Sequence, residues 1–480
     1  MVMFPIIVVY EVGLMKNFVK NFIYAFGAQC VSMLASLAVT FIVPSLIGVT
    51  EFAYWQLFLT YVTYVNISRL GLMDGLYLRL GGKKYEDLDY NLLSMERRVF
   101  IMFQTFVAIC VLAGVLLLDF EGDRTFVLVA CCVCIVIINA NNFLGYILQA
   151  VNLTRRYSAS VILQNVMWFV AVLVIIVLKI YSYKVIIVMY ILGSVCGGIY
   201  LAWYAREIVK HRKADHKLVF MDIKENISCG IKLMVATYAG NLIISSARMI
   251  IDASWGVEVF GYFSFSLTLA NVFLTFINQV SIVVFPALRR VKSEKQHDAY
   301  YLMRNILSLL LPVVMFGYLP ITIIVHLIFS QYEQSLVYLP IFLPICTFDG
   351  KMQMMCTTFF KSLRKETMLL WINICTLAGS IGLACVGAII VRNVEFVAYS
   401  ILVVIALRSV VSELILGHMM ENDIRKELIQ EVVLVIIFVV LARFFSAAYM
   451  FVIYGIIYLL YIAVNHYRVT KILSISKSLR

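Results

Sequence analysis

The sequence predicts an all-α, polytopic integral membrane protein, and three observations support this fold class. First, 63% of the 480 residues are hydrophobic and 14% are charged, against roughly 45–50% apolar and about 25% charged in soluble domains. Second, apolar stretches of about 20 residues, enough to cross a bilayer, follow one another along the chain. Third, basic residues gather between alternate stretches. A soluble enzyme and a disordered chain are therefore excluded.

The apolar stretches predict the membrane-spanning helices in order. Each has about the length that an α-helix needs to cross the hydrocarbon core. We expect about fourteen transmembrane helices, joined by short loops. The predicted spans are residues 22–47, 52–78, 99–118, 125–150, 159–178, 185–205, 227–251, 259–288, 305–329, 339–360, 367–391, 395–417, 429–445 and 448–465.

The basic residues predict how these helices are oriented. If the N-terminus is cytoplasmic, 29 of the 39 Lys and Arg residues lie in cytoplasmic segments and four lie in outside loops. Membrane proteins carry such a surplus on the cytoplasmic side. Both termini are therefore expected in the cytoplasm. Residues 1–14 lack the basic start and cleavage site of a signal peptide, which leaves Met1 and Met15 as alternative starts.

A short internal repeat predicts how the spans are grouped. The segment GVTEFAYW at 48–55 recurs as GVEVFGYF at 256–263, with four identical positions. Both copies are expected in the first outside turn of a six-span block. Two blocks in the same orientation are typical of transporters with parallel repeats. The predicted units are an N-terminal bundle at 1–225, a C-terminal bundle at 226–425, and two further helices with a basic tail at 426–480.

Ionisable side chains within the predicted spans indicate a functional interior, because charges are costly in a bilayer and usually face a cavity. Deep basic groups outnumber deep acids and come from both halves of the chain. A central cavity lined in this way favours an anion, and phosphate suits both Arg and Lys. The predicted cavity residues are Arg69, Arg248, Lys351 and Arg408, and the candidates for ion coupling or pairing are Asp74, Asp252, Asp349 and Glu413.

Some of these charges have a simpler alternative role, which is to pair with one another and join helices. Arg248 and Asp252 are four residues apart and share a helix face, so they can pair. Arg408 and Glu413 are five apart and align less well. For the other two basic groups a place in the cavity is favoured.

The span at 339–360 is the best candidate for a broken helix that lines the cavity. Pro340 and Pro344 interrupt backbone hydrogen bonding, and Gly350 separates Asp349 from Lys351. Transporters commonly build their sites from such discontinuous helices.

Motifs for catalysis, nucleotide binding and metal binding do not occur in the sequence. It contains neither G-x-x-x-x-G-K-[ST] nor H-E-x-x-H, and its Cys residues have no ligand spacing. We therefore expect no catalytic residue, no metal, no cofactor and no nucleic-acid partner. Three amides in the span 125–150 either pack helices together or bind sugar hydroxyls. They are Asn139, Asn141 and Asn142.

Three local stretches carry a resemblance to a known family. They are Ile47-Gly48-Val49 running to Gly71-Leu72-Met73-Asp74-Gly75-Leu76, then Arg248-Met249-Ile250-Ile251-Asp252 with the turn after it, and Leu363-Arg364-Lys365. With the span pattern, they resemble the MOP (multidrug/oligosaccharidyl-lipid/polysaccharide) exporter superfamily, and within it the Wzx-type polysaccharide-unit flippases. The resemblance implies two six-helix bundles that meet in a V, plus two peripheral helices. It also implies a cationic cavity, for which the four basic residues named above fit.

The leading hypothesis is a flippase for O-antigen, capsule or exopolysaccharide biosynthesis. By resemblance, it moves an undecaprenyl-diphosphate-linked oligosaccharide across the bacterial inner membrane by alternating access. The alternative is a cation-coupled multidrug exporter of the same superfamily, which would need an anionic pocket. A polymerase or ligase would need a large outside loop, and a scaffold would not need deep charges. Expected partners are the substrate and membrane lipid, with polysaccharide polymerase and chain-length proteins as further candidates. A monomer is expected, and the sugar and the coupling ion stay open.

Overall fold

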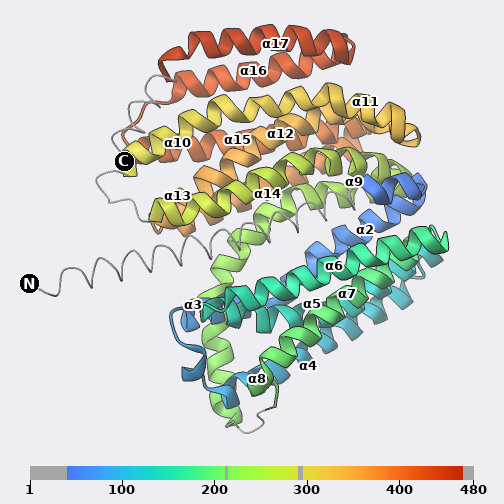
Figure 1. Cartoon of the computed structure of the whole chain (residues 1–480), viewed down its shortest axis with the longest axis vertical. Helices are drawn as coiled ribbons and strands as arrows, with labels where there is room; N and C mark the ends of the chain where they lie inside the picture. Colours follow the sequence, from blue (N-terminus) through green and yellow to red (C-terminus); the bar gives the residue numbers. More distant parts are fainter. Residues whose placement is uncertain (1–40, 211–213, 290–295, 469–480) are drawn as a thin grey trace, which may run out of the picture.

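The computed structural model describes residues 41–210, 214–289 and 296–468. Its helices run side by side in two groups, with α3 to α8 in the lower group of Figure 1 and α10 to α17 in the upper group. Within the described ranges, nine helices are long and apolar enough to cross a membrane, and the elements are all helical. The predicted fold class is confirmed. Most of the first predicted span, 22–47, lies outside the described residues.

The N-terminal lobe, as we call α2 to α8, follows the predicted spans with one division. The predicted span 52–78 is split where Leu70 and Gly71 adopt positive φ values of 53° and 83°, which ends one helix and starts the next. Its elements are α2 (Val49–Val65), η1 (Asn66–Arg69), α3 (Leu72–Leu80), η2 (Tyr85–Asp87), α4 (Tyr90–Leu117), α5 (Gly122–Ala150), α6 (Thr154–Leu178), α7 (Tyr183–Tyr204) and α8 (Arg206–Lys210).

The C-terminal lobe, as we call α10 to α17, contains two interrupted helices. Pro312 lies in the 3-10 segment η4, which separates α10 from α11, and the π-helical segment η6 separates α12 from α13. Its elements are α10 (Gln296–Leu310), η4 (Leu311–Gly317), α11 (Tyr318–Ile328), η5 (Ser330–Val337), α12 (Leu339–Lys351), η6 (Met352–Cys356), α13 (Thr357–Ser362), α14 (Glu366–Val386), η7 (Gly387–Val391), α15 (Val394–Met419), α16 (Arg425–Phe444) and α17 (Ala447–Val464).

The helix α9 (His216–Arg289) belongs to both lobes. Its first turns lie against α3, where glycines allow backbone contact: a Cβ on Gly230 would lie 2.0 Å from the Gly71 carbonyl oxygen. Further along, Asn373 of α14 donates a hydrogen bond to the Ala236 carbonyl at 2.8 Å. The backbone leaves the helical region at Gly256, with φ 84° and ψ 175°, inside the predicted turn between two spans. The predicted domain boundary at 225/226 therefore falls within a continuous helix.

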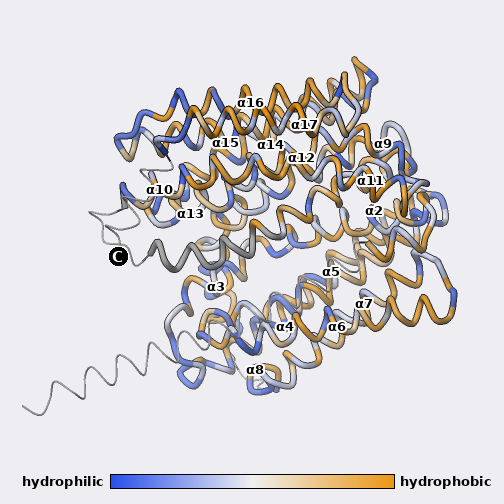
Figure 2. Tube along the Cα trace, turned by 45° about the horizontal axis from the view of Figure 1, so that its top comes forward, coloured by the Kyte–Doolittle hydropathy of each residue, from blue (hydrophilic) through white to orange (hydrophobic). Residues whose placement is uncertain are grey.

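Hydrophobic residues follow the helices along their length, while hydrophilic residues gather at helix ends (Figure 2). The buried core extends through both lobes and includes Phe52, Phe58, Phe260 and Phe342. Aromatic rings make many of its contacts, such as the stack of Trp55 on Trp168 with a centroid distance of 5.1 Å. Large hydrophobic side chains on the outer faces of the helices remain exposed, as expected where lipid is the solvent.

Candidate functional site

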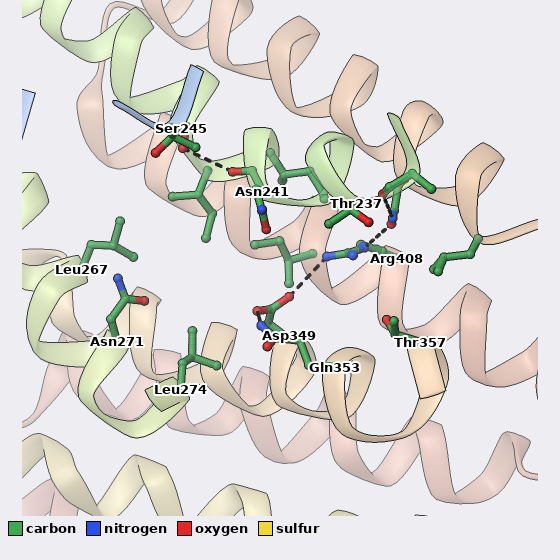
Figure 3. Close-up of a pocket in the computed structure, with 18 of the residues that line it drawn as sticks. Thr237, Asn241, Ser245, Leu267, Asn271, Leu274, Asp349, Gln353, Thr357 and Arg408 are labelled. Atoms are coloured by element: carbon green, nitrogen blue, oxygen red, sulfur yellow. Dashed lines mark hydrogen bonds and ion pairs between the residues drawn. The ribbon is translucent and has the colours of Figure 1, made fainter. Parts of the chain in front are cut away.

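A cavity of about 680 Å³ lies between α9 and the helices α12 to α15, and Thr63 of α2 closes one side. Figure 3 shows polar side chains that converge on it from several helices. On the predicted broken helix, the lining residues recur every fourth position, at Asp349, Gln353, Thr357 and Lys361. A four-residue spacing overshoots the 3.6-residue α-turn, and the wider π-turn of η6 offsets part of that drift. The break therefore keeps one polar face toward the cavity.

Arg408 on α15 supplies one of the cavity's cations. Its Nη1 is 3.2 Å from an oxygen of Asp349, and its Nε donates a hydrogen bond of 2.9 Å to Asn373 (Figure 3). Gly240 of α9 leaves room for the guanidinium, because a Cβ there would lie 3.1 Å from Nη2. The alternative in which Arg408 pairs with Glu413 does not occur in the described structure. Its acid partner, Asp349, lies on α12, which packs against α15.

Arg248 on α9 is the second cation. Its Nη2 donates hydrogen bonds to Gln56 of α2 at 3.1 Å and to Ser264 at 2.9 Å, and its Nε has no partner among the described residues. The alternative in which Arg248 pairs with Asp252 does not occur in the described structure. Asp252 instead accepts two hydrogen bonds from Arg124 of α5, at 2.7 and 2.8 Å. No acid pairs with Arg248 in the described structure, so its charge stays available.

Lys351 does not line the cavity. It lies in a buried cluster with Arg304 of α10, Glu413 of α15 and Glu431 of α16, all of whose side chains are at most 3% exposed. Lys351 Nζ is 3.1 Å from Glu413 Oε1 and also contacts Glu431. Arg304 reaches the two carboxylates at 3.4 and 3.6 Å. Two cations and two anions from four helices thus balance one another behind the cavity wall.

Arg69 and Asp74 lie at the contact between α3, η1 and α9. Arg69 is 2% exposed, contacts the Tyr238 hydroxyl, and lies over the rings of Tyr146 and Tyr238 at 5.1 and 5.0 Å. Asp74 is also buried, and its Oδ2 has no partner among the described residues. Neither residue is among those that line the cavity. Arg69 therefore bridges the two lobes from beside the cavity.

The three predicted amides pack helices within the N-terminal lobe. Asn139 donates to Ser68 at 3.0 Å and to Gln104 at 2.9 Å. Asn141 donates to the Ser194 carbonyl at 2.7 Å, and Asn142 donates to Asn66 at 3.2 Å. Of the two roles that the sequence left open, these contacts match helix packing.

The residues that sequence reasoning missed form the neutral wall of the cavity. Thr237, Asn241 and Ser245 recur at four-residue intervals on α9, and Asn271 and Thr275 face them from beyond the Gly256 bend. That polar stripe on an apolar helix was readable in the sequence. Lys361 was counted in a cytoplasmic segment, yet it lines the cavity. The lining thus carries Arg248, Arg408 and Lys361 against one carboxylate, Asp349, and the cavity has a net positive charge.

Within the described ranges, His, Cys, Asp and Glu side chains form no group that could hold a metal ion. The cavity can bind an anionic group through its cations, and it can bind hydroxyl-rich groups through its amides and hydroxyls.

Comparisons with known proteins place the chain in a family and identify its fold. Residues 18–292 match the protein family described as "Polysaccharide biosynthesis protein". Comparison with the curated proteins finds no match. Among solved structures, the chain is similar to an inward-facing multidrug resistance MATE family transporter of the MOP superfamily, with TM-score 0.63, 13% identity, and coverage of 81% of this chain and 94% of that one. An outward-facing MATE transporter gives TM-score 0.57 and 11% identity, covering 83% and 95%. A MOP superfamily transporter from Pyrococcus furiosus Vc1, described as having a binding pocket of reverse polarity, gives 0.54 and 14%, covering 83% and 95%.

Proposed function

The chain belongs to the polysaccharide biosynthesis protein family of the MOP superfamily, and from that premise we propose that it is a flippase for undecaprenyl-diphosphate-linked oligosaccharides. The resemblance drawn from the sequence is confirmed at the level of family and fold. The apolar helices and the fold that the chain shares with solved transporters support a multi-pass membrane transporter. The proposal adds the cargo, the direction from the cytoplasmic to the periplasmic leaflet, the bacterial inner membrane, and the cytoplasmic location of both termini.

The observation that carries the proposal is the division of the cavity lining into cations and neutral polar groups. Arg248, Arg408 and Lys361 suit a diphosphate, because guanidinium groups bind phosphate oxygens in pairs and an ammonium supplies a point charge. The amides and hydroxyls of α9, together with Gln353, suit sugar hydroxyls. A cavity of about 680 Å³ takes a headgroup with its first sugars. Longer saccharides would extend into the space between the lobes.

The alternative of a multidrug exporter for cationic compounds is less well supported by this lining. Such a pocket needs an anionic group for its ligand. The one carboxylate in the lining, Asp349, already pairs with Arg408 at 3.2 Å. A cationic drug would therefore compete with a fixed guanidinium for it.

The proposed cycle follows from how the lobes meet. At the end predicted to face outside, Arg124 of α5 clasps Asp252 of α9, and Gln331 of η5 donates to the carbonyls of Pro44 and Ile47 at 3.1 Å. These contacts close the outer end. Release of the cargo outside would require them to break while the cytoplasmic ends approach. An ion gradient acting on Asp74, Asp349 or Glu413 is one energy source, and removal of the product outside is another.

The test uses Arg408→Gln and Arg248→Gln in the purified full-length chain in proteoliposomes. The probe is undecaprenyl diphosphate linked to N-acetylglucosamine, and the measured quantity is its appearance in the opposite leaflet. Loss of one charge-assisted phosphate contact should slow transport at least about tenfold. Arg443→Gln is the matched control, because the side chain of this Arg is 63% exposed, pairs with Glu395 at 3.5 Å and does not line the cavity. Transport at the rate of the unmodified chain in all three variants would refute the assignment of Arg248 and Arg408 to the diphosphate. Absence of transport by the unmodified chain would refute the proposed cargo.

A further inference from the structure

The helices α2 and α9, which line part of the cavity, also border an apolar groove that the proposed headgroup site does not use. A groove of about 290 Å³ lies on the opposite side of α2 and α9 from the cavity, and nearly all of its lining is apolar. Neighbouring residues on α2 and α9 line different spaces, one the cavity and the next the groove. Thr63 lines the cavity and Tyr64 the groove, and the pairs Ser245/Ser246 and Arg248/Met249 divide in the same way. The full groove lining is Tyr61, Tyr64, Ser246, Met249, Ile250 and Ile381.

We call the contact between α2 and α9 the seam. Polar side-chain contacts join it at two points, which we call clasps, with a stretch between them that has none. At one end Arg248 donates to Gln56 at 3.1 Å, and at the other end Arg69 contacts Tyr238. Between these clasps lie residues 57–68 and residues 239–247. In this described stretch no hydrogen bond or ion pair joins the two segments.

Four hydroxyl groups in that stretch are satisfied within their own helices. Thr60 and Thr63 donate to carbonyls of α2 at 2.8 and 3.1 Å. Ser245 and Ser246 donate to carbonyls of α9, each at 3.2 Å. Parting the helices here would leave these four hydroxyl groups paired, and exposing an unpaired polar group to lipid is the main cost of opening a helix contact in a membrane.

From these contacts, we propose that the seam between α2 and α9, bounded by Arg69–Tyr238 and Arg248–Gln56, is the slot through which the polyprenyl chain of the cargo passes from the cavity to the membrane. The inference rests on the proposed function. An amphiphile whose phosphates lie at Arg248 and Arg408 must place its hydrocarbon within one helix thickness of them. The groove is the apolar space at that distance, and it receives the first isoprenoid units.

The slot also has room on its outer side. Ile381 of α14 borders the groove and is 40% exposed. Next to it in the sequence, Gly379 and Gly382 would carry a Cβ into open space, with no atom within 4 Å. The hydrocarbon can therefore continue from the groove along α14 into lipid.

Photo-crosslinking of the full-length chain tests the slot. p-Benzoylphenylalanine replaces Ile381 in one protein and Leu383 in the other, and the probe is radiolabelled undecaprenyl diphosphate. Leu383 is the matched control, because it lies on the same helix, is 36% exposed and does not line the groove. We expect label at position 381 well above position 383. A tenfold excess of unlabelled undecaprenyl diphosphate should lower that label about tenfold, while the same excess of phosphatidylglycerol should leave it unchanged.

Three results would overturn the proposal. Equal label at 381 and 383, in a chain that still binds the probe saturably, would reject the slot and leave the proposed cargo standing. Equal competition by phosphatidylglycerol would show that the groove holds ordinary membrane lipid. Absence of any saturable binding of undecaprenyl diphosphate to the unmodified chain would reject the cargo and the slot together.

Discussion

Breaking the Arg124–Asp252 clasp should shift the chain toward its outward-open form. The pair is bidentate, and the Asp252 side chain is 1% exposed while that of Arg124 is 24% exposed. In Arg124→Gln, the closed form keeps a buried carboxylate without its cation, whereas an open form would hydrate it. Removing one partner of a fully buried pair costs about 3–5 kcal/mol. Partial exposure of Arg124 reduces this to about 2 kcal/mol, which is roughly 30-fold in an equilibrium constant.

The assay is pulsed electron spin resonance between labels at Glu121 and Asn393, two exposed positions on loops of different lobes at the same predicted end. The ratio of long to short distances should rise about 30-fold in Arg124→Gln. The double variant Arg124→Gln/Asp252→Asn should recover part of the shift. Lys184→Gln is the control, because its 2.8 Å pair with Asp123 lies within one lobe. A ratio unchanged by Arg124→Gln, or changed equally by Lys184→Gln, would refute the reasoning.

Two further predictions concern stability. Glu431→Gln should lower the melting temperature in detergent, because it leaves two buried cations facing one carboxylate at a cost of about 3–5 kcal/mol. Arg443→Gln on the same helix should not lower it. Equal melting temperatures of the two variants would contradict the charge balance. Gly75→Ala should destabilise the chain by about 1–3 kcal/mol, because its Cβ would lie 1.9 Å from the Asn226 carbonyl oxygen. Gly114→Ala, which meets open space, should be tolerated, and similar melting curves for both would argue against the close contact of α3 with α9.

Features set by short-range physics were predictable from the sequence. Apolar length predicts most of the helices, and Pro340 and Pro344 predict a discontinuity near residue 350. The sequence does not show that the interruption is the π-helical segment Met352–Cys356. Only the structure shows that this segment keeps Asp349 and Lys361 on the cavity side.

The partners of the charged residues could not be predicted from their spacing in the sequence. The rule that residues four apart can pair is sound for an isolated helix, but Asp252 of α9 pairs with Arg124 of the distant helix α5. Lys351 pairs with Glu431 outside the cavity. Glu431 lies on α16, one of the two helices outside the predicted repeat. Tertiary contacts between distant segments decide which charges remain available, and a single sequence does not contain them.

The double attachment of α9 limits how far the lobes can swing. The helix packs on α3 at Gly230 and accepts a hydrogen bond from α14 at Ala236. If the contacts of α9 with the N-terminal lobe beyond Ala236, such as that of Tyr238 with Arg69, part during the proposed cycle, the length left between the lobes is the six-residue piece between these two points. As a helix that piece spans about 9 Å, and fully drawn out it would span about 20 Å. The difference between these two lengths limits how far the ends of this piece can move apart. Travel at this end can exceed it only by tearing α9 from one of its anchors, so the amplitude of the transport stroke is built into six residues of one helix.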